Sequence, residues 1–193
     1  MIVLNLMAEP SAGKSVTAAG AFYQFSINNF RAEVIPEVAK GYAWETPRDE
    51  NGKALTHPIF GQQIFLLGEQ NRMLERVIGQ REIAIMECPL IMTAIYSLDD
   101  YFPSFIPLVL EQFNAYKNLN IVLERGHDFD PQGRVHDEGQ SKEVKTKLIN
   151  FLDTNNISYV KMKTHDDIDK QIVKYVRDKH FPNKLLKSCY GAI

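Results

Sequence analysis

Short apolar runs alternate along the chain with longer segments in which apolar residues recur every three or four positions. A run of four to six residues that is mostly apolar is typical of a strand buried on both faces. This pattern predicts five strands, at residues 2–7, 32–36, 83–86, 120–123 and 158–162. Strands that alternate with helices predict βαβ units around a parallel sheet. We therefore expect an α/β fold, a three-layer α/β/α sandwich with a five-stranded parallel sheet.

The segments between these strands have the spacing of helices. Val16, Ala19, Tyr23 and Ile27 recur every three or four positions and predict one face of a helix that begins at Gly13. The same spacing predicts four more helices, within residues 64–78, 105–116, 144–152 and 168–176. Strand and helix thus alternate over most of the chain.

Two segments have neither spacing. Residues 41–58 contain prolines and glycines and are predicted to be loop-like or broken, and residues 124–140 form a long polar stretch. No internal repeat, low-complexity tract or linker divides the sequence. Because 193 residues suffice to bury a sizeable core, we expect one domain that spans residues 1–193.

The first predicted strand is followed at once by Ala8-Glu-Pro-Ser-Ala-Gly13-Lys14-Ser15. This is the phosphate-loop pattern G-x-x-x-x-G-K-[ST] with Ala8 in place of the first glycine, in the strand-to-helix context that the pattern requires. Backbone N–H groups and the helix dipole converge on a phosphate in such a loop. We expect Lys14 to bridge the β- and γ-phosphates of ATP and Ser15 to ligate Mg²⁺. The residues expected to bind the nucleotide are Ala8, Glu9, Pro10, Ser11, Ala12, Gly13, Lys14, Ser15 and Val16.

Two carboxylates directly follow predicted strands. Glu37 comes after the second strand and Glu87 after the third, and ligands of parallel sheets gather at these carboxyl ends. Glu87 holds the position at which an apolar strand delivers a carboxylate to magnesium, so we expect it to be a metal ligand and a catalytic residue. Glu37 is placed to accept the proton of an incoming hydroxyl. The alternative for each is an ordinary strand-end charge paired with a surface lysine.

The polar stretch is predicted to contain a lid over about residues 125–139. Glycine hinges and guanidinium groups are what a mobile lid over a transferring phosphoryl group needs, so we expect Arg125 and Arg134 to be catalytic. A solvated loop is the alternative. His127 and His136 lie in the same stretch without a metal-ligand spacing and are expected to be solvated.

The acceptor of the phosphate has weaker sequence signals. A lone tryptophan beside a charged loop can stack on a base, and two glutamines seven residues apart share one face of a helix and suit a nucleobase edge. Core packing and solvation are the respective alternatives. The residues expected to bind the acceptor are Glu37, Trp44, Arg48, Gln63 and Gln70, with Arg72 as a further candidate.

Composition limits the kinds of partner. A formal net charge of -2 gives no global basic field for nucleic acid, although the lysine-rich residues 161–187 are either a polyanion contact or the solvated face of a helix. Cys88 and Cys189 form no metal-ligand spacing and suit a reducing compartment. The apolar start is too short for a signal peptide, and no apolar run approaches the ~18 residues that cross a bilayer. We expect a cytoplasmic protein without membrane contact.

Together these motifs resemble a family of small P-loop kinases similar to the kinase domain of nicotinamide riboside kinases. The resemblance runs from Ile2 to about Leu152 and is greatest to a bacteriophage branch that includes kinases of 5-hydroxymethyluracil within DNA. Besides the phosphate loop, it rests on Glu37-Val-Ala-Lys40, Trp44-Glu45 with Arg48, Gln63, Glu69-Gln70 with Arg72, Glu87-Cys-Pro89, Asn120, Arg125 and Pro-Gln-Gly-Arg134.

The chain departs from the family pattern in three places. The family loop reads Gly-Glu-Pro-Gly-Ser-Gly, and Asp-Ser-Pro after the third strand is Glu87-Cys88-Pro89 here. Residues 49–57 are inserted or diverged.

The resemblance implies an ATP- and Mg²⁺-dependent kinase that phosphorylates 5-hydroxymethyluracil in phage DNA, in the cytoplasm of the host cell. Such an acceptor base has to be flipped out of the stack. Three alternatives stay open: a nucleoside, nucleotide or nicotinamide riboside kinase with a small acceptor, an NTPase without a phosphoryl acceptor, and a non-catalytic phosphate-binding module, which Ala8 suggests.

Overall fold

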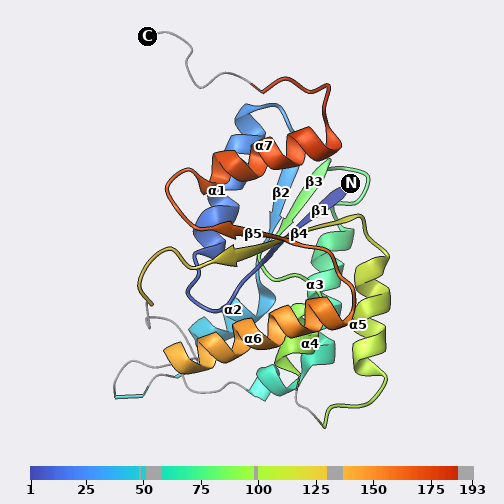
Figure 1. The fold of residues 1–193 in the computed structure, drawn as a ribbon. Coiled ribbons are helices and arrows are strands. Elements are labelled where there is room, and N and C mark those ends of the chain that lie inside the picture. The colour runs from blue at the N-terminus through green and yellow to red at the C-terminus, as the bar shows by residue number, and fades with distance from the viewer. Residues whose placement is uncertain (48, 51–57, 98–99, 130–136, 187–193) are drawn as a thin grey trace.

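A parallel β-sheet with helices on both faces forms the centre of the molecule (Figure 1). The computed structural model describes residues 1–193 apart from residues 48, 51–57, 98–99, 130–136 and 187–193. In this part of the chain the sheet has five strands in the order β2-β3-β1-β4-β5, and neighbouring strands are parallel. The strands are β1 (Ile2–Met7), β2 (Ala32–Ile35), β3 (Ile83–Met86), β4 (Asn118–Glu124) and β5 (Val160–Lys163). The predicted α/β/α sandwich is confirmed.

Two layers of helices cover the sheet. One face carries α1 and α7, and the other carries α3, α4, α5 and α6 (Figure 1). The helices are α1 (Lys14–Ile27), α2 (Val38–Glu45), α3 (Gln63–Glu75), α4 (Met92–Tyr96), α5 (Phe105–Asn114), α6 (Glu138–Thr154) and α7 (Ile168–His180), with a 3₁₀ turn η1 (Pro58–Gly61). None of the helices in the described residues has both the length and the apolar character that crossing a bilayer requires.

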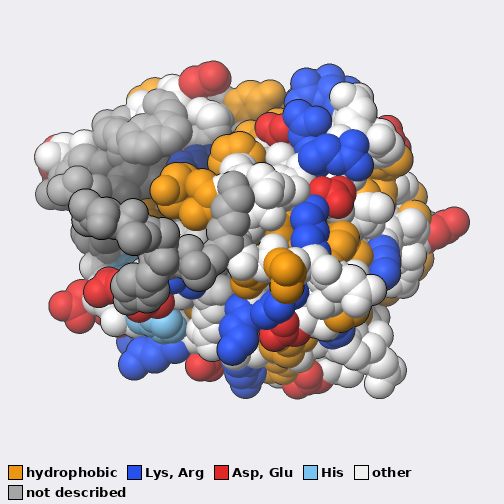
Figure 2. Space-filling view, turned by 90° about the horizontal axis from the view of Figure 1, so that it is seen from above, with side chains coloured by type: hydrophobic (Ala, Val, Ile, Leu, Met, Phe, Trp, Pro, Cys, Tyr) orange, Lys and Arg blue, Asp and Glu red, His pale blue; other side chains and the backbone are white. Residues whose placement is uncertain are grey.

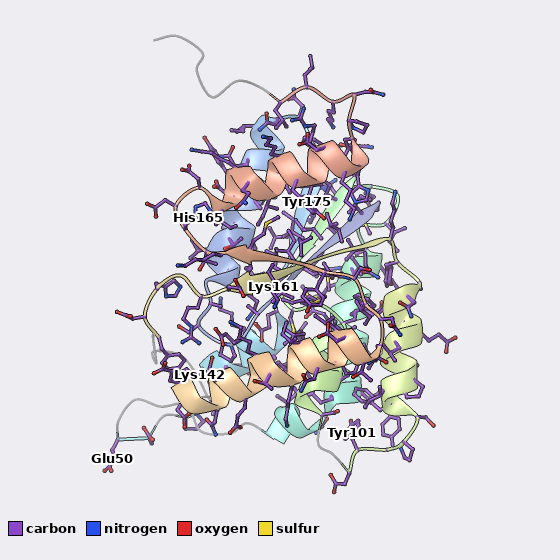
Figure 3. All side chains as sticks on the ribbon, viewed as in Figure 1. Glu50, Tyr101, Lys142, Lys161, His165 and Tyr175 are labelled. Carbon is purple, nitrogen blue, oxygen red and sulfur yellow. The ribbon has the colours of Figure 1, made fainter. Side chains whose placement is uncertain are left out.

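The central strand is apolar on both sides because each side faces a helix layer. Ile2, Leu4 and Leu6 of β1 pack with α1 and α7, while Val3 and Met7 pack with the helices of the opposite face. This alternation follows from the two-residue period of a strand. Side chains fill the space on both sides of the sheet (Figure 3).

The face of α1 that meets the sheet differs from the apolar spacing in the sequence. Val16 is 79% exposed and Tyr23 is 60% exposed, so the predicted stripe points to solvent. The buried residues of the helix are Thr17, Ala18, Ala21, Gln24 and Phe25. Two alanines on this face allow a close approach to the sheet and its partner helix α7, which leaves the larger residues outside.

Two short helices lie where none was predicted. Residues 38–45 form α2 although residues 41–58 were predicted to be loop-like. Residues 92–96 form α4, whose first four residues are buried. The polar stretch is also shorter than its pattern suggests, because Asp137 and Gln140 close the first turn of α6 with a capping box.

A row of asparagines connects β1 and β4, with Asn5 and Asn120 buried and Asn118 partly buried. Asn5 Nδ2 donates to Asn118 Oδ1 and Asn120 Oδ1, each at 2.9 Å, and Asn120 Nδ2 donates to the Ser158 carbonyl at 3.0 Å. Asn5 is 1% exposed. Since buried polar groups need partners, this row favours the observed register of β1 against β4.

Replacing Asn5 by leucine is expected to lower the free energy of unfolding by about 1–3 kcal/mol, because Asn118 and Asn120 each lose a buried hydrogen-bond donor. Urea unfolding followed by circular dichroism measures the change. Asn150→Leu, at an exposed position of α6, is the control and should change stability by less than about 0.5 kcal/mol. Equal effects of the two substitutions would contradict the role of the row.

Candidate active site

Four neighbouring strands deliver the candidate chemistry to one edge of the sheet. In spatial order, β2 leads to Glu37, β3 to Glu87, β1 to the phosphate loop and β4 to Arg125. Parallel strands place their carboxyl ends on the same edge. The order of these strands in the sheet differs from their order in the sequence. Because β1 pairs with β3 on one side and with β4 on the other, Glu87 and Arg125 lie on opposite sides of the loop that follows β1.

The backbone of the predicted phosphate loop is curved at Ser11 and Gly13, although alanine replaces the first glycine of the motif. Gly13 caps α1 in the left-handed region at φ 80°, and Ser11 also has a positive φ of 62°. Ala8 does not have a positive φ, so its β-carbon causes no backbone strain there. Lys14 Nζ folds back over the loop and lies 3.4 Å from the Ala8 carbonyl. The replacement at position 8 is therefore compatible with the loop conformation.

The hydroxyl of Ser15 connects the loop to two charged side chains. Ser15 Oγ donates to Glu87 Oε2 at 3.4 Å, and Lys40 Nζ donates to Ser15 Oγ at 2.8 Å. Glu87 is buried, with 9% of its surface exposed. Ser15 and Glu87 thus lie together, as the sequence predicts. Lys40 joins them, and the sequence predicts no role for it.

These oxygen atoms suit Mg²⁺. The metal is a hard cation that binds through one or two protein oxygens together with substrate phosphates rather than in a cage of protein ligands. The Ser15 hydroxyl and the Glu87 carboxylate supply such a pair. Within the described residues, no three His, Cys, Asp or Glu side chains form a group that could hold a metal ion by themselves.

Gln70 holds the backbone on both sides of Glu37. Its Oε1 accepts a hydrogen bond from Val38 N at 3.1 Å, and its Nε2 donates to the Pro36 carbonyl at 3.0 Å. Gln70 is 3% exposed. The amide of Gln70 therefore supports the turn between β2 and α2, and its expected contact with the acceptor stays a prediction. The Glu37 carboxylate, by contrast, makes no hydrogen bond or ion pair with any residue that the structure describes.

Cys88 lies among the charged groups of the site. Burial raises the pKa of its thiol well above the ordinary value, the carboxylates of Glu37 and Glu87 raise it further, and Lys14 opposes them. A thiol with a raised pKa is protonated and a poor nucleophile. Cys88 is therefore expected to stay a neutral thiol beside the charged groups.

Arg125 lies against the phosphate loop. Its Nη2 donates to the Pro10 carbonyl at 3.2 Å and to Ser141 Oγ at 2.8 Å, and it lies 3.5 Å from Glu9 Oε1. Ser141 Oγ donates to the same Pro10 carbonyl at 2.9 Å. The side chains of Arg125 and Glu9 are only 11% and 6% exposed. These four groups form a buried clamp, hereafter the loop clamp, which includes Ser141, a residue without any sequence signal.

The segment after β4 makes a close backbone contact. Gly126 N donates to Thr164 Oγ1 at 2.8 Å, and a β-carbon at position 126 would lie 1.9 Å from the Thr164 carbonyl oxygen. Only glycine fits there. His127 is exposed, as expected, yet its Nε2 lies 3.5 Å from where a β-carbon of Gly13 would be. The predicted lid thus starts at a fixed point beside the phosphate loop.

Several predicted site residues are placed elsewhere or fall outside the described residues. Arg48 and Arg134 are outside them, as is the side chain of Trp44 in α2. Gln63 begins α3 and is buried. Arg72 is exposed and pairs with Glu69 at 3.0 Å.

The lysine-rich segment does not form one basic surface. Lys170 pairs with Asp167 at 2.6 Å, and Lys184 pairs with Glu82 at 3.1 Å. Figure 2 shows basic side chains interleaved with acidic and apolar ones on the face seen from above. This arrangement favours the solvated-helix interpretation of residues 161–187 over a polyanion contact.

Known proteins resemble the chain in structure. No family model and no curated protein matches its sequence. NadR in complex with NR superposes with a TM-score of 0.69 at 15% identity, covering 97% of this chain and 52% of that one. NadR in complex with NAD and AMP-PNP gives 0.65 at 16% identity, covering 97% and 51%. Deoxyadenosine kinase from M. mycoides, with products dCMP and dCDP bound, gives 0.53 at 14% identity, covering 92% and 97%.

The chain has the fold of the P-loop kinases. It spans about half the length of the two NadR structures. At these identities the likeness concerns the fold alone.

Proposed function

We propose that the protein is an ATP-dependent kinase that transfers the γ-phosphate to a hydroxyl group. The observation that carries the proposal is the contact of Ser15 Oγ with Glu87 Oε2 at 3.4 Å, directly behind a loop in which Gly13 is left-handed. A hydroxyl and a carboxylate meeting at the base of a phosphate cradle are the protein ligands of a metal–nucleotide complex.

Mg²⁺, when bound by Ser15 and Glu87, would neutralise charge on the phosphates. Lys14 lies over the loop and supplies a positive charge to the β- and γ-phosphates. Glu37 accepts the proton of the acceptor hydroxyl while the oxygen of that hydroxyl forms a bond to the γ-phosphorus. The bond from that phosphorus to the β–γ bridging oxygen breaks, and ADP leaves with the electron pair. Gln70 keeps Glu37 at the sheet edge during this step.

The acceptor that we propose is 5-hydroxymethyluracil in DNA. This choice rests on the sequence resemblance. A free nucleoside-like acceptor is the second candidate. It is favoured by fold neighbours that are bound to NR or to dCMP, and by surface lysines that are paired with acidic residues.

The test is transfer of labelled phosphate from ATP to a panel of acceptors: DNA containing hydroxymethyluracil, plain DNA, free nucleosides and nicotinamide riboside. Labelled modified DNA together with activity that falls steeply with added salt supports the DNA acceptor, because phosphate contacts release counterions. Labelled free nucleosides with little salt dependence support the second candidate. ATP hydrolysis that no acceptor changes would overturn the kinase assignment in favour of an NTPase.

Lys14→Met is expected to weaken ATP binding about 10- to 100-fold, because a charge-assisted hydrogen bond to phosphate is lost. Isothermal titration calorimetry measures the dissociation constant. Lys142→Met is the control, since Lys142 is exposed on α6 and pairs with Glu138 at 2.9 Å (Figure 3). ATP affinity that is unchanged by Lys14→Met would contradict the nucleotide site.

A further inference from the structure

Lys40 is a cation inside the candidate site that the proposed reaction does not use. It lies in the first turn of α2, three residues after Glu37, and it is partly buried. Its Nζ donates to Ser15 Oγ at 2.8 Å, although the elements that carry the two residues follow strands separated by β3. Ser15 is also the residue expected to ligate the metal. The ammonium group therefore contacts the oxygen atom that Mg²⁺ would need.

This contact is supported by its surroundings. Gln70 bonds to Val38 N and the Pro36 carbonyl and so fixes the start of the helix that carries Lys40. Ser15 Oγ donates its single hydrogen towards Glu87 Oε2 at 3.4 Å while it accepts from Lys40. A lone pair of the Ser15 hydroxyl thus points towards the ammonium group of Lys40, where it would otherwise be available to a metal ion.

An ammonium group and a divalent metal cannot share this oxygen at low cost. Two cations on one partly buried atom repel each other strongly, because water screens them poorly there. Nucleotide phosphates, in contrast, are neutralised by either cation. The site therefore has two mutually exclusive ways to place positive charge beside Ser15.

We propose that Lys40 is a built-in cation that stands in for the metal: it neutralises the phosphates when nucleotide binds without Mg²⁺, and it leaves Ser15 when the metal–nucleotide complex binds. The proposal rests on the proposed nucleotide site and adds a second charge state to it. No covalent bond is made or broken. It predicts that Lys40 and Mg²⁺ are coupled negatively, so that each matters most when the other is absent.

The experiment is calorimetric titration of the full chain with AMP-PNP, in excess EDTA and in excess Mg²⁺. Lys40→Met is expected to raise the dissociation constant about tenfold or more in EDTA, since a charge-assisted hydrogen bond to phosphate is lost. With Mg²⁺ the same substitution should change it by no more than about twofold. Lys40→Arg keeps the charge and should restore most of the metal-free affinity. Lys161→Met, on the exposed edge of β5 (Figure 3), should change neither value.

The outcomes separate the inference from the proposed function. An equal loss of affinity in EDTA and in Mg²⁺ overturns the role of Lys40 and leaves the nucleotide site in place. Absence of AMP-PNP binding to the unaltered chain in Mg²⁺ overturns both. If thermal unfolding shows that Lys40→Met is poorly folded, Lys40→Gln, which keeps the length and polarity of the side chain, repeats the comparison with the same two expected results.

Discussion

Replacing Glu37 by glutamine is expected to lower kcat for phosphoryl transfer by about 10²- to 10⁴-fold, the contribution of a positioned general base. The amide keeps the size of the side chain but cannot accept the acceptor proton. Because Glu37 makes no hydrogen bond or ion pair with a described residue, the fold should not depend on its charge. The dissociation constant for ATP should therefore change by less than about twofold. Single-turnover transfer from labelled ATP to the accepted substrate measures the rate of the step.

Glu33→Gln is the matched control for this substitution. Glu33 lies in β2, the strand that leads to Glu37, but it pairs with Arg81 at 3.0 Å, and both of these side chains are more than a third exposed. It should leave kcat unchanged. If Glu37→Gln keeps the full rate of transfer, Glu37 is not the base, and Glu87 becomes the carboxylate to test.

Replacing Arg125 by methionine is expected to lower the free energy of unfolding by about 3–5 kcal/mol, because removing one partner of a buried ion pair leaves the other charge uncompensated. Here the carboxylate of Glu9, whose side chain is 6% exposed, would lose Arg125, and the Pro10 carbonyl would lose one of two donors. Urea unfolding measures the loss. ATP affinity should fall with it, since the phosphate loop loses part of the loop clamp.

Two further variants show whether the ion pair is the cause. Arg72→Met removes an exposed surface pair, with Glu69, and should change the stability far less than Arg125→Met, because water screens the two charges. Combining Arg125→Met with Glu9→Gln removes the stranded charge and should restore part of the stability. A loss for Arg125→Met no larger than that for Arg72→Met would show that the loop clamp contributes little.

The strands were predictable because the signal for them is local. A strand with helices on both sides must be apolar throughout, and the run at residues 2–7 has this property over its whole length apart from Asn5. The turn between β1 and α1 was predictable for a similar reason, since the motif at residues 8–15, the preceding strand and the following helix are contiguous in the sequence. The buried faces of the helices were less predictable. Val16 and Tyr23 have the spacing of a buried helix face but lie in solvent, because α7 packs against the face of α1 that carries Ala18 and Ala21.

Apart from the meeting of Ser15 and Glu87, the contacts between distant segments of the site were not predicted from the sequence. Lys40 meets Ser15 across 25 positions, and Arg125 meets Pro10 across 115. The expected action of Arg125 on the phosphoryl group stays a prediction, and its described contacts are with Glu9, Pro10 and Ser141. Gln70 likewise supports Glu37 from a different element. Such roles depend on which strand ends are neighbours, and no local spacing encodes this order.

Arg125 and Ser141 meet on a single carbonyl, that of Pro10. Arg125 directly follows β4, and Ser141 lies in the first turn of α6. A displacement of the start of α6 would therefore remove one of the two hydrogen bonds that hold this carbonyl. The turn between β1 and α1 is thus sensitive to changes in a helix that lies more than a hundred residues further along the chain.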